Sequence, residues 1–277
     1  MAGPAETVTV GSVVASASAT LAAAGCDTPR LDAELLLASA MGVTRTTLFL
    51  TPAAVVPASA ATAFESLVGR RARREPVAYI LGVKHFRRLE LVVDERVLIP
   101  RPETAVLVEA CVDALAQRAR VADVGTGSGA VALALKDERP DLSIVGIDVS
   151  LDAVAVARGN AERLGLDVEF AVGDLLGDHA AAFDAVVANL PYVCAGDPLP
   201  PEVAVFEPGD ALFAGADGLD LIRRLTASLE GPSLVALEHG FGQADAVAAL
   251  VSVAGFRKVS RFSDLAGISR VVVGQRR

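Results

Sequence analysis

From Arg120 onward, the chain alternates between short apolar segments typical of β-strands and stretches with helical spacing. Alternation of this kind produces a mainly parallel sheet with helices on both faces. The sequence therefore predicts an α/β fold whose ligand lies at the carboxyl ends of the strands, near the switch in strand order. Seven strands are expected: Val121–Val124, Ser143–Asp148, Val168–Val172, Ala185–Ala188, Leu234–Glu238, Arg257–Phe262 and Arg270–Val273.

A glycine-rich loop, Gly125-Thr126-Gly127-Ser128-Gly129, joins the first of these strands to a helical pattern over Ala130–Leu135. Glycine lets the backbone turn tightly and approach a ligand closely, and the amides at the helix start point toward that ligand. The second strand ends at Asp148, 19 residues after Gly129. An acid at this spacing can hydrogen-bond the hydroxyls of a ribose. The loop and the acid together predict a ligand that contains a nucleoside.

The charge beside the loop distinguishes two such ligands. A dinucleotide site uses Gly-x-Gly-x-x-Gly and holds a pyrophosphate at the helix start. Here the glycines stand at every second position, and Asp123 precedes them. A carboxylate in that place repels a pyrophosphate and favours a cationic sulfonium and an α-ammonium group. These charges favour S-adenosyl-L-methionine, with a dinucleotide and a ligand-free structural loop as the alternatives.

The predicted strand Ala185–Ala188 runs directly into Asn189-Leu190-Pro191-Tyr192. The Asn189 side-chain oxygen and the Leu190 carbonyl can each accept one N–H of a planar NH2 group, while the Tyr192 ring packs on its face. Asn and Pro are also common in plain turns. The neighbouring glycine loop and Asp148 favour a site that holds the NH2 group to be methylated.

The region before the sheet has a different character. Residues 8 to about 75 are rich in Ala and Leu with helical spacing, and Pro29, Pro52 and Pro57 stand at expected helix starts. A small helical bundle without chemistry of its own is predicted. Residues 86–93 and 97–99 alternate like a hairpin, and a rigid turn at residues 100–104 then leads into an amphipathic helix over residues 105–116.

Composition and charge limit the partners. The chain carries a net charge of −9, whereas proteins that bind nucleic acid through its phosphates need a basic surface. The basic run over residues 70–74 is interpreted as a solvated helix end. An acidic stretch follows Tyr192 and is expected to attract a cationic group; it contains Asp197, Glu202, Glu207, Asp210, Asp217 and Asp220.

The three cysteines lie far apart and suggest neither disulfides nor a metal site. No segment reaches a charge-free transmembrane length, and a basic leader is absent from the start of the sequence. We therefore expect a cytoplasmic enzyme that needs no metal and does not associate with membranes.

Several motifs together resemble the HemK-type protein-(glutamine-N5) methyltransferases, which methylate peptide-chain release factors. The resemblance runs nearly end to end, and its most family-specific segment is Ile99-Pro100-Arg101-Pro102-Glu103-Thr104. The other matching segments are residues 31–36, 75–82, 123–129, 206–208, 211–212, 218–219 and 237–240.

The resemblance implies a Rossmann-like class I methyltransferase domain, a helical domain that binds release factors, and an Asn-Pro-Pro-Tyr clamp for the glutamine amide. Carried over, residues 125–129 would wrap the methionine part of the cofactor and Asp148 would bind its ribose. Asp174 and Leu175 would border the adenine, and residues 189–192 would hold the substrate amide. The expected domains are residues 1–78 for substrate docking, 79–102 as a connector with a hairpin, and 103–277 for methyl transfer.

Two residues depart from the family pattern. Leu175 stands where an aromatic ring often packs on the adenine, and Leu190 replaces the first proline of the clamp. Leu190 keeps the carbonyl acceptor but frees φ and adds an N–H. Asn-Leu-Pro-Tyr also resembles the motif of rRNA adenine dimethyltransferases. An adenine, a free small amide or guanidinium, and a non-catalytic binding role therefore stay as alternatives to a glutamine in a release factor.

Overall fold

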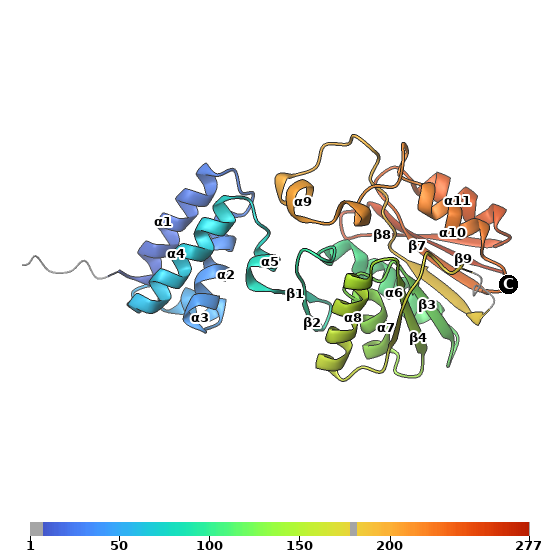
Figure 1. Cartoon of the computed structure of the whole chain (residues 1–277), viewed down its shortest axis with the longest axis horizontal. Helices are drawn as coiled ribbons and strands as arrows, with labels where there is room; N and C mark the ends of the chain where they lie inside the picture. The colour runs from blue at the N-terminus through green and yellow to red at the C-terminus, as the bar shows by residue number, and fades with distance from the viewer. Residues whose placement is uncertain (1–7, 178–181, 277) are drawn as a thin grey trace, which may run out of the picture. The chain divides into compact units, whose positions relative to one another are not determined.

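The computed structural model describes residues 8–177 and 182–276. Contacts between Cα atoms divide the chain into two compact units (Figure 1). The first, here called the helical unit, comprises residues 1–82 and 200–206, and the second, here called the sheet unit, comprises residues 83–199 and 207–277. A segment from the middle of the sequence thus belongs to the unit formed by the N-terminal region.

The helical unit is built from short amphipathic helices around one apolar core. Thr9 caps the first helix, and Pro29 occupies the first turn of the second, as expected for a proline at a helix start. The core includes Leu21, Leu36 and Phe64, all nearly inaccessible to solvent. The helices are α1 (Val10–Ala23), α2 (Pro29–Met41), α3 (Arg45–Leu50), α4 (Ala58–Ala72), α5 (Val77–Leu81) and α9 (Pro201–Phe206).

Two expectations about this unit are wrong. Pro52 follows α3 in a turn instead of starting a helix, because α4 begins after Pro57. The basic run after residue 70 is not a solvated helix end. Arg71 is buried, and its guanidinium pairs with Asp32 at 2.7 Å and with Glu202 of α9 at 2.9 Å. Hydrophobic spacing alone cannot reveal such a pair.

The sheet unit contains one seven-stranded sheet in the order β5-β4-β3-β6-β7-β9-β8. The five strands from β5 to β7 are parallel, and β9 and β8 are antiparallel to their neighbours. This confirms the mainly parallel seven-stranded sheet. The strands are β3 (Arg120–Val124), β4 (Ser143–Asp148), β5 (Glu169–Val172), β6 (Ala185–Ala188), β7 (Leu234–Glu238), β8 (Lys258–Ser263) and β9 (Ser269–Gln275).

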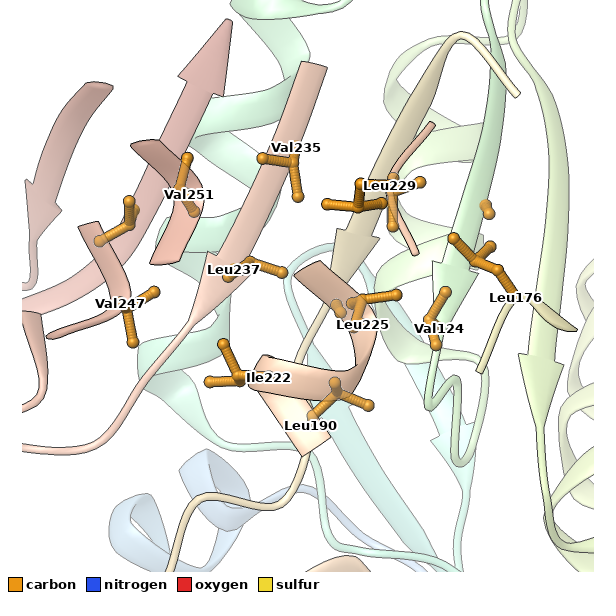
Figure 2. Packing of buried hydrophobic residues seen from close by; sticks show 14 of the residues in the cluster. Val124, Leu176, Leu190, Ile222, Leu225, Leu229, Val235, Leu237, Val247 and Val251 are labelled. Carbon is orange, nitrogen blue, oxygen red and sulfur yellow. The ribbon is translucent and has the colours of Figure 1, made fainter. Parts of the chain in front are cut away.

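Helices cover the sheet and bury its central strands. Every residue of β6 and β7 is buried, which agrees with the continuous apolar runs of these strands. The helices are α6 (Ala105–Ala114), α7 (Ala130–Glu138), α8 (Leu151–Leu164), α10 (Asp220–Ala227) and α11 (Ala244–Val253), with 3-10 turns η1 (Pro102–Thr104) and η3 (Gly209–Ala211). In Figure 2, Ile222 and Leu225 of α10 lie close to Leu237 of β7, in the same apolar cluster.

The predicted hairpin exists, but its arms are shifted. They are β1 (Val83–Phe86) and β2 (Leu89–Val92), paired antiparallel, and residues 97–99 form no strand. The turn falls at Arg87, whose positive φ of 51° was not evident from the alternating pattern. The buried Asn160 of α8 fixes the second arm, because its side chain hydrogen-bonds both the N–H and the carbonyl of Val92.

Candidate active site

The glycine loop after β3 has the backbone that its sequence predicts. Gly125, Gly127 and Gly129 all have positive φ, at 74°, 54° and 82°, a region that residues with a side chain rarely adopt. A Cβ on Gly125 would also lie 3.1 Å from the Leu190 side chain, which belongs to the loop after β6. Because β3 and β6 are neighbouring parallel strands, these two loops meet at the carboxyl edge of the sheet, where the strand order switches.

Asp123 lies beneath this loop and does not line the cavity described below. Its Oδ2 accepts hydrogen bonds from the Thr126 hydroxyl at 2.6 Å and from the Ala132 N–H at 3.1 Å. Burial raises the pKa of this carboxyl to about 6. The two hydrogen bonds act in the opposite direction, because they favour the charged form. Asp123 therefore ties the loop to the first turns of α7, so its effect on a cationic ligand would act through the loop.

Asp148 stands at the end of β4 and faces the same loop. Its Oδ2 accepts a hydrogen bond from the Gly127 N–H, and its Oδ1 accepts one from the Ser150 N–H, both at 2.9 Å. Ser150, and not Asp148, caps α8, because the Ser150 hydroxyl oxygen accepts from the Ala153 N–H. Asp148 therefore has no helix-capping role that would explain its position.

A cavity of about 410 Å³ opens at this edge of the sheet. It brings together eight of the residues predicted for the site: Gly125, Gly127, Asp148, Asp174, Leu175, Asn189, Leu190 and Pro191. Thr126, Ser128, Gly129 and Tyr192 lie outside its lining. Leu175 has a positive φ of 53°, a strained conformation for a leucine, at the position expected beside the adenine.

Part of the cavity wall was not predicted from the sequence. Leu98 belongs to the expected strand over residues 97–99, Arg96 comes just before it, and Leu221 comes from α10. Pro208 and Asp210 come from the segment after α9. Arg96 and Leu98 come just before the motif over residues 99–104, and Pro208 ends the motif over residues 206–208. Asp210 belongs to the predicted acidic stretch, whereas no sequence signal marked Leu221.

An ion pair joins those two motifs. The Glu207 carboxylate accepts a hydrogen bond from the Ile99 N–H at 3.1 Å and pairs with the Arg101 guanidinium at 2.6 Å. The Glu207 side chain is almost fully buried, so the pair is shielded from solvent. Glu207 thus holds the two segments together on one side of the cavity.

The acidic stretch after Tyr192 is largely neutralised by arginines of the same unit. Glu207 pairs with Arg101, and Asp217 and Asp220 both pair with Arg223. In the helical unit, Glu202 pairs with two arginines. The expectation that this whole stretch attracts a cationic substrate is therefore wrong, because four of its six carboxylates already have cationic partners.

The Asn189 carboxamide is held in one orientation. Its Nδ2 donates to the hydroxyl of Thr104 at 3.1 Å, and Thr104 itself is buried in the turn before α6. Oδ1 must then point away from Thr104 and is left to accept a hydrogen bond. The next residue, Leu190, has its side chain buried in the sheet core (Figure 2). Any hydrogen bond from Leu190 to a ligand must therefore come from its backbone.

Tyr192 packs closely on the loop after β7. A Cβ on Gly240 would lie 3.1 Å from the Tyr192 ring, and the Gln243 side-chain amide donates to the Tyr192 carbonyl at 3.0 Å. Burial raises the pKa of the Tyr192 phenol to about 12, and the negative charge of Glu238 adds to this shift. The ring is therefore neutral at physiological pH and can pack on an uncharged group.

Comparison with known proteins covers both units. Residues 12–82 match the PrmC N-terminal domain, and residues 102–199 match the methyltransferase small domain. The chain is 40% identical to a release factor glutamine methyltransferase of Rhodospirillum rubrum over 99% of its own length and 89% of that protein. It is 44% identical to the enzyme of the same name from Pseudomonas aeruginosa, over 89% of this chain and 92% of the relative.

The chain belongs to the release factor glutamine methyltransferase family. Family membership agrees with the resemblance seen in the sequence, and it makes the protein an enzyme. The domain match over residues 102–199 includes the glycine loop, Asp148 and the Asn-Leu-Pro-Tyr segment, so the family's methyltransferase domain contains the cavity's principal loops.

The fold of this family member also resembles that of more distant proteins. A methyltransferase from Pyrococcus furiosus aligns over 75% of this chain and 98% of its own, with a TM-score of 0.53 and 14% identity. Among the helices of the described residues, none is long and apolar enough to cross a membrane.

Proposed function

We propose that this enzyme transfers a methyl group from S-adenosyl-L-methionine to the side-chain amide nitrogen of a glutamine in a peptide-chain release factor. The observation that carries this proposal is identity of about 40% along nearly the whole chain, including the helical unit, to enzymes named for this reaction. A shared methyltransferase domain alone would support only the reaction class.

The cavity residues fit the cofactor. Gly125 and Gly127 leave the wall free of side chains where a ligand must approach the backbone, and Asp148 presents a carboxylate at the end of β4. Gly125 to Gly129 would hold the methionine part, Asp148 the ribose, and Asp174 and Leu175 the adenine. When bound, S-adenosyl-L-methionine supplies an electrophilic methyl carbon attached to a cationic sulfur.

The clamp residues act on the acceptor amide. An amide nitrogen is a poor nucleophile, because its lone pair is shared with the carbonyl. Asn189 Oδ1 and the Leu190 carbonyl would each accept one N–H of the acceptor and hold its nitrogen in line with the methyl group. Both oxygens also stabilise the positive charge that develops on the nitrogen, so the site works by positioning and by preorganised electrostatics. The proton leaves to water after alkylation.

The test compares acceptors under identical conditions. The purified enzyme is incubated with methyl-labelled cofactor and one of five acceptors: a release factor, the same factor with its accepting glutamine replaced by alanine, a short RNA, free glutamine, or free arginine. Label is expected only in the unaltered release factor. Transfer to RNA would favour adenine as the acceptor, and equal transfer to free glutamine or arginine would favour a small-molecule substrate.

A further inference from the structure

The partner of Asn189 is itself part of a longer contact. Thr104 lies at the end of η1, 85 residues earlier in the chain, and its hydroxyl accepts from Asn189 Nδ2. On its other side Thr104 lies beside Glu238 at the end of β7, and its hydroxyl stabilises the charged form of that carboxyl. The sheet register pairs Ala188 with Leu237, so Asn189, directly after β6, lies at the same level as Glu238, the last residue of β7.

Glu238 is an unusual residue for this position. It is only 1% exposed, and among the described residues its Oε2 has no hydrogen-bond partner. A buried carboxylate without full pairing is costly. Burial raises its pKa to about 7, while the Thr104 hydroxyl stabilises its charged form. An apolar side chain would pack equally well at this position of β7. The presence of an acidic residue at position 238 therefore needs another explanation.

The explanation lies in the direction of the hydrogen bonds. A hydroxyl that donates its one proton to a carboxylate can only accept from its other neighbour. When the Thr104 hydroxyl donates to ionised Glu238, it can only accept from Asn189, and this agrees with the hydrogen bond that Asn189 Nδ2 donates to it. A protonated Glu238 could instead donate to Thr104, which could then donate to Asn189 Oδ1 and turn the carboxamide around.

We propose that Thr104 and Glu238 are positioning residues that fix the Asn189 carboxamide with its oxygen toward the methyl acceptor. The role in catalysis rests on the proposed function, since it needs an NH2 acceptor in the clamp. Neither residue touches the acceptor; both act through Asn189.

Three further charges influence Glu238. Glu103 disfavours the ionised form, whereas Arg101 and Arg270 favour it. Tyr192 is neutral in this pH range, because burial raises its pKa to about 12. The arginines lie before η1 and on β9, and both are paired with other acids, Arg101 with Glu207 and Arg270 with Asp264. Glu238 therefore titrates near neutral pH, and turnover should rise as it ionises.

The first experiment changes Thr104. Thr104→Val keeps the shape but removes the hydroxyl, and it should lower kcat by about 10- to 100-fold, the range for groups that orient a functional residue. The KM for S-adenosyl-L-methionine should be unchanged. Thr104→Ser should restore most of the rate. Thr226→Val is the matched control, because Thr226 is equally buried on α10 and hydrogen-bonds only within its helix.

The second experiment changes Glu238 and follows pH. In the wild type, kcat should rise between about pH 6 and about pH 8, as expected for a group that titrates near 7. Glu238→Gln can still accept from Thr104 through its amide oxygen, so it should remain active but lose this rise. An unchanged pH profile in Glu238→Gln, or wild-type turnover in Thr104→Val, would overturn the proposal.

A third measurement needs no methyl acceptor. In 15N-labelled protein, the side-chain amide protons of Asn189 should exchange with solvent more slowly in the wild type than in Thr104→Val. If the wild type failed to methylate a release factor, the proposed function would fall, while this measurement would still decide whether Thr104 orients Asn189. Equal exchange in the two proteins would overturn the orientation itself.

Discussion

At the scale of single residues, Asn189 gives the sharpest test of the clamp. Asn189→Ala should lower turnover by roughly 10²-fold or more, because it removes one preorganised acceptor from the transition state. The fold should survive, since the residue follows the end of β6 and its side chain is only partly buried. Single-turnover kinetics with a release factor measure the effect. Near-wild-type turnover would rule out a mechanism with two acceptors.

Asp148 is the residue-scale test of the cofactor. Asp148→Ala should weaken S-adenosyl-L-methionine binding by roughly 1.5–3 kcal/mol, the scale for losing a charged hydrogen-bond partner. It also removes the acceptor of the Gly127 N–H, so the glycine loop loses part of its support. Titration calorimetry checks the affinity, and Asp167→Ala, at an exposed acid outside the cavity, serves as the control.

Leu190 separates backbone from side-chain effects in the clamp. Leu190→Ala should destabilise the protein by about 2–4 kcal/mol, because the side chain is buried in the sheet core and packs on Gly125. Leu190→Pro keeps the carbonyl acceptor and restores the residue that the family pattern has there, so turnover should be retained. Thermal unfolding and turnover of both variants test this. Loss of activity in a folded Leu190→Pro protein would contradict a role for the carbonyl alone.

At the scale of elements, α9 is attached to α2 and α4 by one buried charge network. Arg71 lies between Asp32 and Glu202, and their side chains are 7%, 6% and 15% exposed. Arg71→Ala should destabilise the helical unit by about 3–5 kcal/mol, because it leaves buried carboxylates without a cation. Chemical denaturation measures the loss.

Two further variants make that prediction specific. Arg73→Ala, at the exposed neighbour of the same helix end, should change the free energy of unfolding by no more than about 0.5 kcal/mol. Adding Asp32→Asn to Arg71→Ala should recover part of the loss, because it removes one of the unpaired charges. A loss that did not respond to Asp32→Asn would point to lost packing instead.

At the scale of the whole molecule, Glu238 should make stability depend on pH. Its pKa is raised from 4.5 to about 7, so the folded state holds a proton that the unfolded state has already released. The stability contribution is therefore complete below about pH 4.5 and is lost as pH rises through about 7. Compared with Glu238→Gln, the wild type should lose about 3 kcal/mol over this window, at 1.36 kcal/mol per unit. Urea unfolding at several pH values measures this, and parallel curves for the two proteins would contradict it.

The sequence by itself determined the sheet and the chemistry at its edge. The bounds of Ser143–Asp148, Ala185–Ala188 and Leu234–Glu238 are found as predicted, because buried parallel strands are continuous apolar runs that need no partner to be recognised. The three glycines of the loop adopt positive φ for an equally local reason. Residues that directly follow such strands could therefore be placed at one edge.

Only the tertiary structure decided which side chains meet there. The shifted hairpin depends on a turn at Arg87. The burial of Arg71 depends on two carboxylates that are far away in the sequence, and the orientation of Asn189 depends on its hydrogen bond to Thr104. None of these follows from periodicity, because a hydrogen bond or ion pair is set by distance in space and not by spacing in sequence. For the same reason, neither the hydrogen-bond partner of Asp123 nor the burial of Glu238 could be predicted. An acidic residue is the same letter in the sequence whether water or protein surrounds its carboxylate in the structure.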